Sequence, residues 1–244
     1  MKKLFIVLAV ALIALAVSCK KDNTEKNKPD AVDLGIEFTR LDGGGNPVTY
    51  KLYWADRNIG ASKPDDFGSY YAWGVTETQT NYYYTKYKWM NNQQNFITKY
   101  CIHPNAWDGE GEMDNKTVLE SGPEGDDVAS KQLGGGWRMP TKEEWEQLLA
   151  ACEISWTGQG SSSGYKLTGK NGESIFIPAA GRWIQEKLDE TFYKGYYWSS
   201  SLGTSASSNA FALKFEYDTQ KMTPKHVVSE TYRYIGASIR PVKE

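Results

Sequence analysis

The sequence predicts one α+β domain over residues 32–244, in which short antiparallel strands outnumber helices. Three observations support this fold class: apolar runs of period two between glycine-rich turns, only two segments with helical spacing, and a length of 244 residues. At about 100–200 residues per domain, that length fits one large domain. Aromatic residues make up 14% of the chain, which excludes a disordered protein. Residues 78–125 predict a long, loop-rich insertion within the domain.

The strands are predicted from alternation and from turn residues. The first expected hairpin encloses the turn Asp-Gly-Gly-Gly-Asn-Pro, and the second encloses Gly-Lys-Asn-Gly, in which Asn-Gly is a strong hairpin signal. Near the end of the chain, large apolar residues alternate with small or charged ones, as in a half-buried strand. The expected strands cover residues 34–41, 48–55, 165–168, 173–177, 211–217 and 235–239.

Two segments carry the signals of a helix. Thr141 and Glu144 form a capping box, and apolar residues then recur at i, i+3, i+4 and i+7, which predicts an amphipathic helix as far as Cys152. A shorter helix is expected over residues 126–133, because two aspartates stand at its positive end and a glycine follows it. The capping box also explains Glu143 and Glu144 without a role in acid–base catalysis.

The first 18 residues have the pattern of a signal peptide. Two lysines precede an unbroken apolar run over residues 4–17, shorter than the roughly 20 residues that a membrane-spanning helix needs. Residues 16–19 read Ala-Val-Ser-Cys and resemble the lipobox of bacterial lipoproteins, in which the cysteine is lipidated and becomes the mature N-terminus. This resemblance implies that residues 1–18 are removed and that Cys19 holds the protein to the membrane.

Residues 19–31, which include the expected lipid site, predict a flexible tether. They are polar and charged, contain Pro29 and show no apolar period. Residues 20–23, Lys-Lys-Asp-Asn, resemble the export signals of surface lipoproteins in Bacteroidota and imply an outer-membrane lipoprotein displayed on the cell surface. Loss of 18 residues with two lysines would leave 26 basic against 30 acidic residues. This balance argues against a nucleic-acid partner, which favours a basic face.

A longer motif indicates a family. Residues 136–145, Gly-Trp-Arg-Met-Pro-Thr-Lys-Glu-Glu-Trp, resemble the G-x-R-[LM]-P-T-x-x-E-W/F signature of formylglycine-generating-enzyme-like domains, a branch of the C-type lectin fold. More closely, the chain resembles the Fibrobacter succinogenes major paralogous domain of Bacteroidota lipoproteins. The other matching segments are residues 52–55, 58–61, 71–74, 175–181, 197–201 and 238–242. The resemblance implies a C-type-lectin-like fold with short strands, two main helices and long loops.

The same resemblance weighs against catalysis. Formylglycine-generating enzymes use a late cysteine pair to activate oxygen through copper, and no cysteine follows Cys152 in this sequence. The Glu-Pro-Asn, Gln-Pro-Asp and Trp-Asn-Asp motifs that hold calcium in sugar-binding C-type lectins do not occur either. We therefore expect a non-catalytic protein without a cofactor, whose loops bind a glycan or protein ligand. The alternatives are a structural or adhesin component of a surface assembly and, least favoured, an enzyme acting on surface polysaccharide.

Aromatic and polar residues of two regions are the candidate ligand contacts, because such side chains give large or adaptable contacts at low entropic cost. One region is the tyrosine-rich start of the insertion, where the alternative is that the rings cover the core. The other comprises residues 199–209 and 218–234, expected as loops; loops of the corresponding region bind ligand in the variable proteins of diversity-generating retroelements, which share this fold. A further tryptophan lies in another expected loop. The candidates are Tyr82, Tyr83, Tyr84, Trp89, Trp183, Asn209, His226, Tyr232 and Arg233.

An acidic segment of the insertion is a weak candidate for calcium binding. Oxygen ligands at alternate positions are what a calcium loop needs. However, an EF-hand loop would require Gly in place of Met113 and Glu in place of Leu119, so a solvated acidic loop is the favoured interpretation. The residues concerned are Asp108, Glu110, Glu112 and Asp114.

Two cysteines remain once Cys19 is assigned to the lipid. Cys101 and Cys152 have two open alternatives, one disulfide or two thiols, because an exported protein allows either. A catalytic pair of Cys101 and His103 is disfavoured, because no orienting partner is visible in the sequence and Pro104 follows at once.

Overall fold

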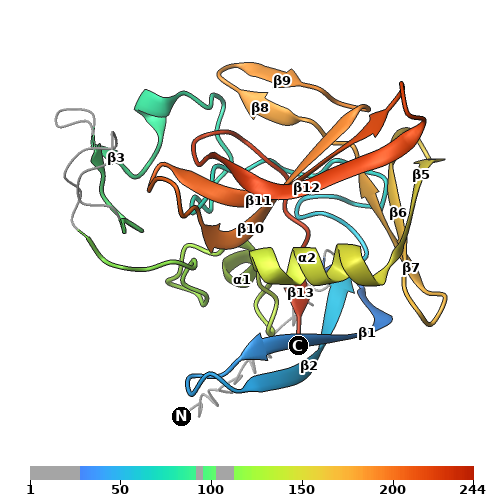
Figure 1. Ribbon diagram of the computed structural model, residues 1–244. Helices are drawn as coiled ribbons and strands as arrows, with labels where there is room; N and C mark the ends of the chain where they lie inside the picture. The colour runs from blue at the N-terminus through green and yellow to red at the C-terminus, as the bar shows by residue number, and fades with distance from the viewer. Residues whose placement is uncertain (1–27, 92–95, 103–112) are drawn as a thin grey trace, which may run out of the picture.

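The structure is a computed structural model that describes residues 28–91, 96–102 and 113–244 (Figure 1). The expected signal peptide, the lipid site Cys19 and the tether up to residue 27 lie outside these ranges. So do His103 and three acidic residues of the weak calcium candidate, Asp108, Glu110 and Glu112. The described residues form a mixed, strand-rich fold of small antiparallel sheets with two α-helices, which agrees with the predicted α+β class.

Three antiparallel sheets of three strands each make up most of the described fold. The first sheet contains β1 (Ala31–Leu41), β2 (Pro47–Ala55) and β13 (Val242–Lys243). The second contains β10 (Lys194–Leu202), β11 (Asn209–Asp218) and β12 (Thr223–Tyr232). The third contains β5 (Glu153–Gln159), β6 (Ser162–Thr168) and β7 (Ser174–Pro178). Two short hairpins join β3 (Met90–Asn91) to β4 (Phe96–Ile97) and β8 (Arg182–Ile184) to β9 (Lys187–Asp189).

Both predicted hairpins are confirmed, and side chains fix their turns. The Asp42 carboxylate accepts hydrogen bonds from the backbone N–H groups of Gly44 and Asn46, each at 2.8 Å, in the turn between β1 and β2. In the β6–β7 turn, the Asn171 amide donates to the backbone oxygen of Asp33 in β1 at 2.8 Å. Strand β13 pairs with β2, so the end of the chain lies against the first hairpin (Figure 1).

Both predicted helices are confirmed within two residues of their expected bounds. Helix α1 (Val128–Leu133) is capped by the Asp127 side chain. Helix α2 (Lys142–Ala151) has the complete capping box: the Thr141 hydroxyl accepts from the Glu144 N–H at 3.2 Å, and the Glu144 carboxylate accepts from the Thr141 N–H at 2.8 Å. Figure 1 shows α2 between the β1–β2 hairpin and the β10–β11–β12 sheet, and it contacts both.

Buried tryptophans hold the two larger core clusters. In the first cluster, α2 packs against the first sheet, and the ring centroids of Trp54 and Trp145 are 4.6 Å apart. In the second cluster, Trp73 and Trp198 are buried, and their indole N–H groups donate to backbone carbonyls at 2.8 and 2.7 Å. Because these N–H groups have partners, the rings are buried without leaving an unsatisfied donor.

The insertion packs onto the domain through aromatic side chains, which form a third cluster. Tyr82 and Tyr87 are buried, and their hydroxyls donate to the backbone oxygens of Tyr70 and Trp73, both at 2.7 Å. The 3₁₀ turn η2 (Tyr84–Lys86) lies between the two tyrosines. The alternative expected for this region, that its rings cover the core, is therefore confirmed for Tyr82.

Four expectations about local structure are wrong. Most of residues 218–234 form β12 instead of a loop, and Trp183 lies in β8. Strand β12 pairs with β11 along its whole length at the edge of the sheet, and polar residues on both of its faces conceal the period of two. Residues 235–239 are buried on both sides and form isolated bridges instead of a half-buried strand. Residues 199–202 belong to β10.

The structure also decides the state of the two cysteines. Cys101 and Cys152 are present as thiols and not as a disulfide. Burial raises the pKa of Cys152 to about 11, so this thiol is protonated at neutral pH and is a poor nucleophile. None of the described helices is long and apolar enough to cross a membrane.

Close packing of the third sheet on the first can be tested at Gly169. A Cβ atom at this glycine would lie 2.0 Å from the backbone oxygen of Leu34 in β1. We expect Gly169→Ala to lower the free energy of unfolding by about 1–3 kcal/mol, because the backbone has to move apart. Gly43→Ala, where nothing lies within 4 Å, is the matched control and should change it by less than about 0.5 kcal/mol. Equal effects in urea denaturation would contradict this packing.

Candidate functional site

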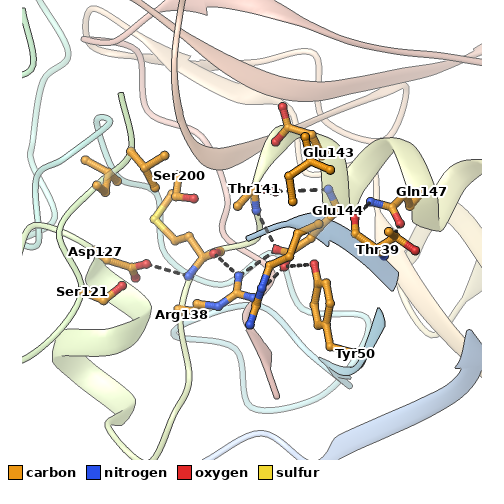
Figure 2. Close-up of a pocket in the computed structure, with 15 residues that line it drawn as sticks. Thr39, Tyr50, Ser121, Asp127, Arg138, Thr141, Glu143, Glu144, Gln147 and Ser200 are labelled. Carbon is orange, nitrogen blue, oxygen red and sulfur yellow. Dashed lines mark hydrogen bonds and ion pairs between the residues drawn. The ribbon is translucent and has the colours of Figure 1, made fainter. Parts of the chain in front are cut away.

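A pocket of about 570 Å³ lies between the β1–β2 hairpin, the start of α2 and the segment that precedes α1 (Figure 2). This volume is within the range of small-molecule sites. Its wall combines exposed apolar side chains at the mouth with charged groups inside. The lining residues that bear on its chemistry are Arg40, Leu41, Tyr50, Val118, Asp127, Arg138, Glu143, Glu144 and Ser200.

The charged groups inside the pocket bind one another. Arg138 forms two hydrogen bonds to the Glu144 carboxylate, at 2.7 and 2.6 Å, and Tyr50 donates to the same carboxylate at 2.8 Å. Burial alone would lower the pKa of Arg138, but its bonds to Glu144 outweigh that effect and raise it. The guanidinium therefore stays charged and paired. Arg138 and Glu144 both belong to the motif recognised in the sequence, so the motif builds an internal ion pair.

Two further charged residues, Glu244 and Arg40, extend this ion pair toward the surface. Glu244 contacts Arg138 at 3.2 Å and also forms an ion pair with Arg40 of β1. The Arg40 guanidinium lies 4.4 Å above the Tyr50 ring. Hydrogen bonding to Arg40 holds the pKa of the Glu244 carboxyl below its usual range. The network thus joins β1, β2, α2 and the last residue of the sequence.

The remaining polar groups of the pocket are also engaged or face outward. Asp127 is buried and accepts the backbone N–H groups of Ser130 and Met139, at 3.0 and 2.8 Å. The Ser200 hydroxyl donates to the backbone oxygen of Pro140. Glu143 is exposed, and Figure 2 shows its side chain pointing away from Arg138. The paired polar groups of this pocket therefore hold neighbouring parts of the chain together, and we call this set of contacts the structural junction.

A different surface unites candidates from both regions singled out in the sequence. The rings of Tyr232 and Tyr234 stack with centroids 5.3 Å apart at 18°, and Tyr84 of the insertion meets Tyr234 edge-on at 5.7 Å. Trp183 packs against the same core cluster as Tyr84 and Tyr234. We call these four residues the aromatic surface. Tyr232 is 56% exposed, and the other three residues are half-buried.

Tyr234 was missed as a candidate, although it connects the two regions. Only its spacing of two residues from Tyr232 could have indicated it, because that spacing places two side chains of an extended chain on one face. Burial and the nearby Tyr232 raise the pKa of the Tyr234 hydroxyl, and Arg182 opposes that rise. Tyr234 is therefore neutral at physiological pH and acts as a ring with a hydroxyl donor.

Two of the predicted ligand contacts are wrong, because they lie in the core. Tyr82 is 2% exposed and Arg233 is 1% exposed. Arg233 donates to the Tyr87 hydroxyl at 2.8 Å and to the backbone oxygen of Ser207 at 2.8 Å, and its guanidinium lies 4.6 Å above the Trp73 ring. Backbone carbonyls and aromatic faces thus surround this cation, and the arginine serves packing.

Three other candidates lie outside the aromatic surface. Trp89 is half-buried and its indole donates to the backbone oxygen of Gly74 at 3.0 Å. His226 is six residues before Tyr232 on β12, about 20 Å along the strand, and burial lowers its pKa. Tyr83 is half-buried next to η2. Asn209, in contrast, is the cross-strand partner of Tyr232 and lies at the edge of the surface.

The described residue of the weak calcium candidate has another role. Asp114 accepts hydrogen bonds from the backbone N–H groups of Tyr100, Cys101 and Lys116, at 2.9, 3.0 and 3.2 Å. Its oxygens therefore brace the loop. Within the described ranges, no group of three or more His, Cys, Asp or Glu side chains could hold a metal ion.

Comparisons with protein-family models, with curated proteins and with solved structures found no significant match for this chain. Its function is therefore inferred from the geometry of the described residues. Of the two sites, the pocket has charged groups that pair with one another, whereas the aromatic surface consists of partly exposed aromatic residues.

The structural role of the ion pair can be tested by Glu144→Gln. This change replaces the buried carboxylate partner of Arg138 by a neutral amide and leaves it the more exposed ion pair with Glu244, so we expect the free energy of unfolding to fall by about 2–4 kcal/mol. Glu143→Gln is the matched control: it removes the same charge from the same helical turn at an exposed position, and should cost less than about 0.5 kcal/mol. Chemical denaturation of both variants measures the difference, and equal losses would refute the role of the ion pair.

Proposed function

We propose that this chain is a non-catalytic lipoprotein of the cell surface whose C-type-lectin-like domain binds a glycan or protein ligand. The observation that carries the proposal is the aromatic surface of Tyr84, Trp183, Tyr232 and Tyr234. Exposed aromatic rings with fixed neighbours are typical of recognition surfaces, because they provide contact area and few rotatable bonds.

The arrangement of the rings favours binding further. Tyr234 is held between the stacked ring of Tyr232 and the edge of Tyr84, so little side-chain entropy remains to be lost when a ligand binds. The surface also draws on three distant segments: the insertion, the β8–β9 hairpin and the end of β12. A sugar ring or an apolar side chain can pack on these faces while the hydroxyls of the tyrosines donate hydrogen bonds.

The C-type-lectin-like part of the proposal is supported by the internal junction. The residues of the family motif, Arg138, Thr141 and Glu144, bond to one another and connect the first hairpin to α2. Short strands, two helices and a long insertion surround this junction, and the final strand pairs with the first hairpin. These are the features that the sequence resemblance implies.

A structural or adhesin role is the second candidate, favoured by strand β12. It forms an edge of its sheet and exposes Val227, which another chain could contact. Lys225 belongs to the same strand and Lys221 precedes it. Lysines on an edge strand oppose the addition of another strand, which weighs against this role. An enzyme acting on surface polysaccharide is the least favoured alternative. In the pocket, Arg138 forms ion pairs with Glu144 and Glu244, and these ion pairs serve the structure.

The binding surface can be tested with a glycan and protein array. We expect Tyr232→Ala to weaken binding of the ligand that is found by at least about tenfold, which corresponds to 1.4 kcal/mol. Tyr193→Ala is the matched control, because Tyr193 is an exposed tyrosine in the β9–β10 loop and is not part of the aromatic surface. If the wild-type protein binds a ligand and both variants keep that binding, the assignment to this surface is wrong.

The lipid anchor can be tested at Cys19. A thiol is the nucleophile that lipid transfer requires, so Cys19→Ser should abolish incorporation of labelled fatty acid and move the protein from the membrane to the soluble fraction. Cys101→Ser controls for the loss of a thiol and should leave both properties unchanged. Protease treatment of intact cells then distinguishes outward display from a periplasmic location. Continued lipid labelling of the Cys19→Ser variant would overturn the assignment.

A further inference from the structure

A small hollow of the molecular surface is rich in lysine. It has a volume of about 190 Å³ and lies on the sheet of β10, β11 and β12. Each of these strands contributes one lysine: Lys194, Lys214 and Lys225. We call this feature the lysine hollow. Tyr196 and Glu216 also line it.

Two of the three lysines have carboxylate partners, and the third does not. Lys194 forms ion pairs with Glu190 at 2.7 Å and Glu216 at 3.4 Å, and Lys225 pairs with Glu216 at 3.4 Å. The half-buried ammonium of Lys214 instead donates to the backbone oxygen of Glu230 at 2.6 Å. Within the described part of the chain, Lys214 has no carboxylate at ion-pair distance.

The carboxylate of Glu230 acts on Lys214 only from beyond ion-pair distance, because other donors hold it. The backbone N–H of Thr204 donates to this carboxylate at 2.7 Å, and the Ser205 hydroxyl donates to it as well. Burial lowers the pKa of Lys214, and the positive charge of Arg182 lowers it further. An ammonium group in this position is stabilised by any anion that reaches it.

Arg182 connects the lysine hollow to the aromatic surface. Its guanidinium lies 4.6 Å above the ring of Tyr196, which is the cross-strand neighbour of Lys214. Its charge acts on the ionisation of both Lys214 and Tyr234, and Trp183 is the next residue in β8. Arg182 is thus the residue that neighbours both features: its guanidinium lies over Tyr196 of the hollow, and it precedes Trp183 of the aromatic surface in β8.

Arg182 is itself poorly paired. Its Nε atom is buried and lies 3.1 Å from the Glu190 carboxylate without an aligned hydrogen bond. The same carboxylate already accepts from Lys194 and from the Tyr196 hydroxyl, each at 2.7 Å. Around the hollow, four cations thus face three carboxylates: Glu190 and Glu216 at ion-pair distance, and Glu230, whose charge acts on Lys214 from farther away. This local excess of positive charge contrasts with the negative net charge of the whole chain.

We propose that the ligand is an acidic glycan, whose carboxylate or sulfate group binds Lys214 and Arg182 while a neighbouring sugar ring packs on the aromatic surface. This inference rests on the proposed function and names the chemical class of its ligand. An anionic substituent would supply the counter-charge that Lys214 lacks, and the ring would cover Tyr232 and Tyr234. The positive charges of Lys214 and Arg182 favour acidic sugars over neutral ones.

The test compares three probes on the full-length protein in detergent micelles: an oligogalacturonate, a heparin oligosaccharide and a neutral cello-oligosaccharide of similar length. We expect one of the acidic probes to bind at least about tenfold more tightly than the neutral one by calorimetry, and this preference to shrink as salt is added. The carboxylated and sulfated probes distinguish the two anions. A single-stranded oligonucleotide that binds as tightly as the best acidic sugar would overturn the assignment to a glycan.

Two variants locate the anion site. Lys214→Met should weaken binding of the acidic probe by at least about tenfold, because a charge-assisted hydrogen bond is lost, whereas Lys214→Arg should retain binding. Lys221→Met, in the exposed β11–β12 turn, is the control and should bind like wild type. Arg182→Gln tests the same site on a separate hairpin and keeps the test decisive if Lys214→Met does not fold.

The outcomes separate this inference from the proposed function. If the neutral probe binds as tightly as the acidic ones and Tyr232→Ala abolishes that binding, the acidic-glycan inference fails and the aromatic surface stands. The inference also fails if Arg182→Gln and Lys214→Met bind the acidic probe like wild type. If none of the sugars binds and the array yields only a protein ligand, glycan binding and the inference fail together.

Discussion

The ion pair between Arg138 and Glu144 joins parts of the chain that are distant in sequence. Glu144 caps α2, receives the hydroxyl of Tyr50 from β2, and binds Arg138, whose backbone pairs with Val242 of β13. Each partner alone would carry a largely buried charge, which is costly, so the helix, the first hairpin and the chain end stabilise one another. The sheet of β10, β11 and β12, which carries Tyr232, packs on this junction through α2.

Local signals predicted the elements that depend on neighbours in sequence. The capping box at Thr141 and the turn at Asp42 are complete within five residues, and the structure has both. Burial of Arg233 and Tyr82 could not be predicted in this way, because their partners lie in other segments. An arginine among tyrosines suggests a binding surface, and only the fold shows that backbone carbonyls from residues 99–100 and 207 surround it.

The candidate site could be predicted only in part, because it also depends on contacts between segments that are distant in sequence. Tyr84, Trp183 and Tyr232 are predicted from residue type; in the fold Tyr84 and Tyr232 both contact Tyr234, and Trp183 packs against the same core cluster as Tyr84 and Tyr234. Lys214 was not predicted as a site residue, because lysines are common at the exposed positions of a strand with alternating residues. The role that we propose for it depends on the cross-strand register, which places Tyr196 and hence Arg182 beside it, while no carboxylate of the described residues lies at ion-pair distance.

The start of β1 at Ala31 sets a limit on where the protein can work. If Cys19 holds the lipid as we propose, residues 19–30 are the entire link between membrane and domain, and twelve residues span at most about 40 Å. The ligand must then come to the protein, because the domain is confined to a layer close to the membrane. For a binding module this confinement raises the effective concentration of binding sites at the membrane. Many copies on one surface can then hold a polymeric ligand although each individual contact is weak.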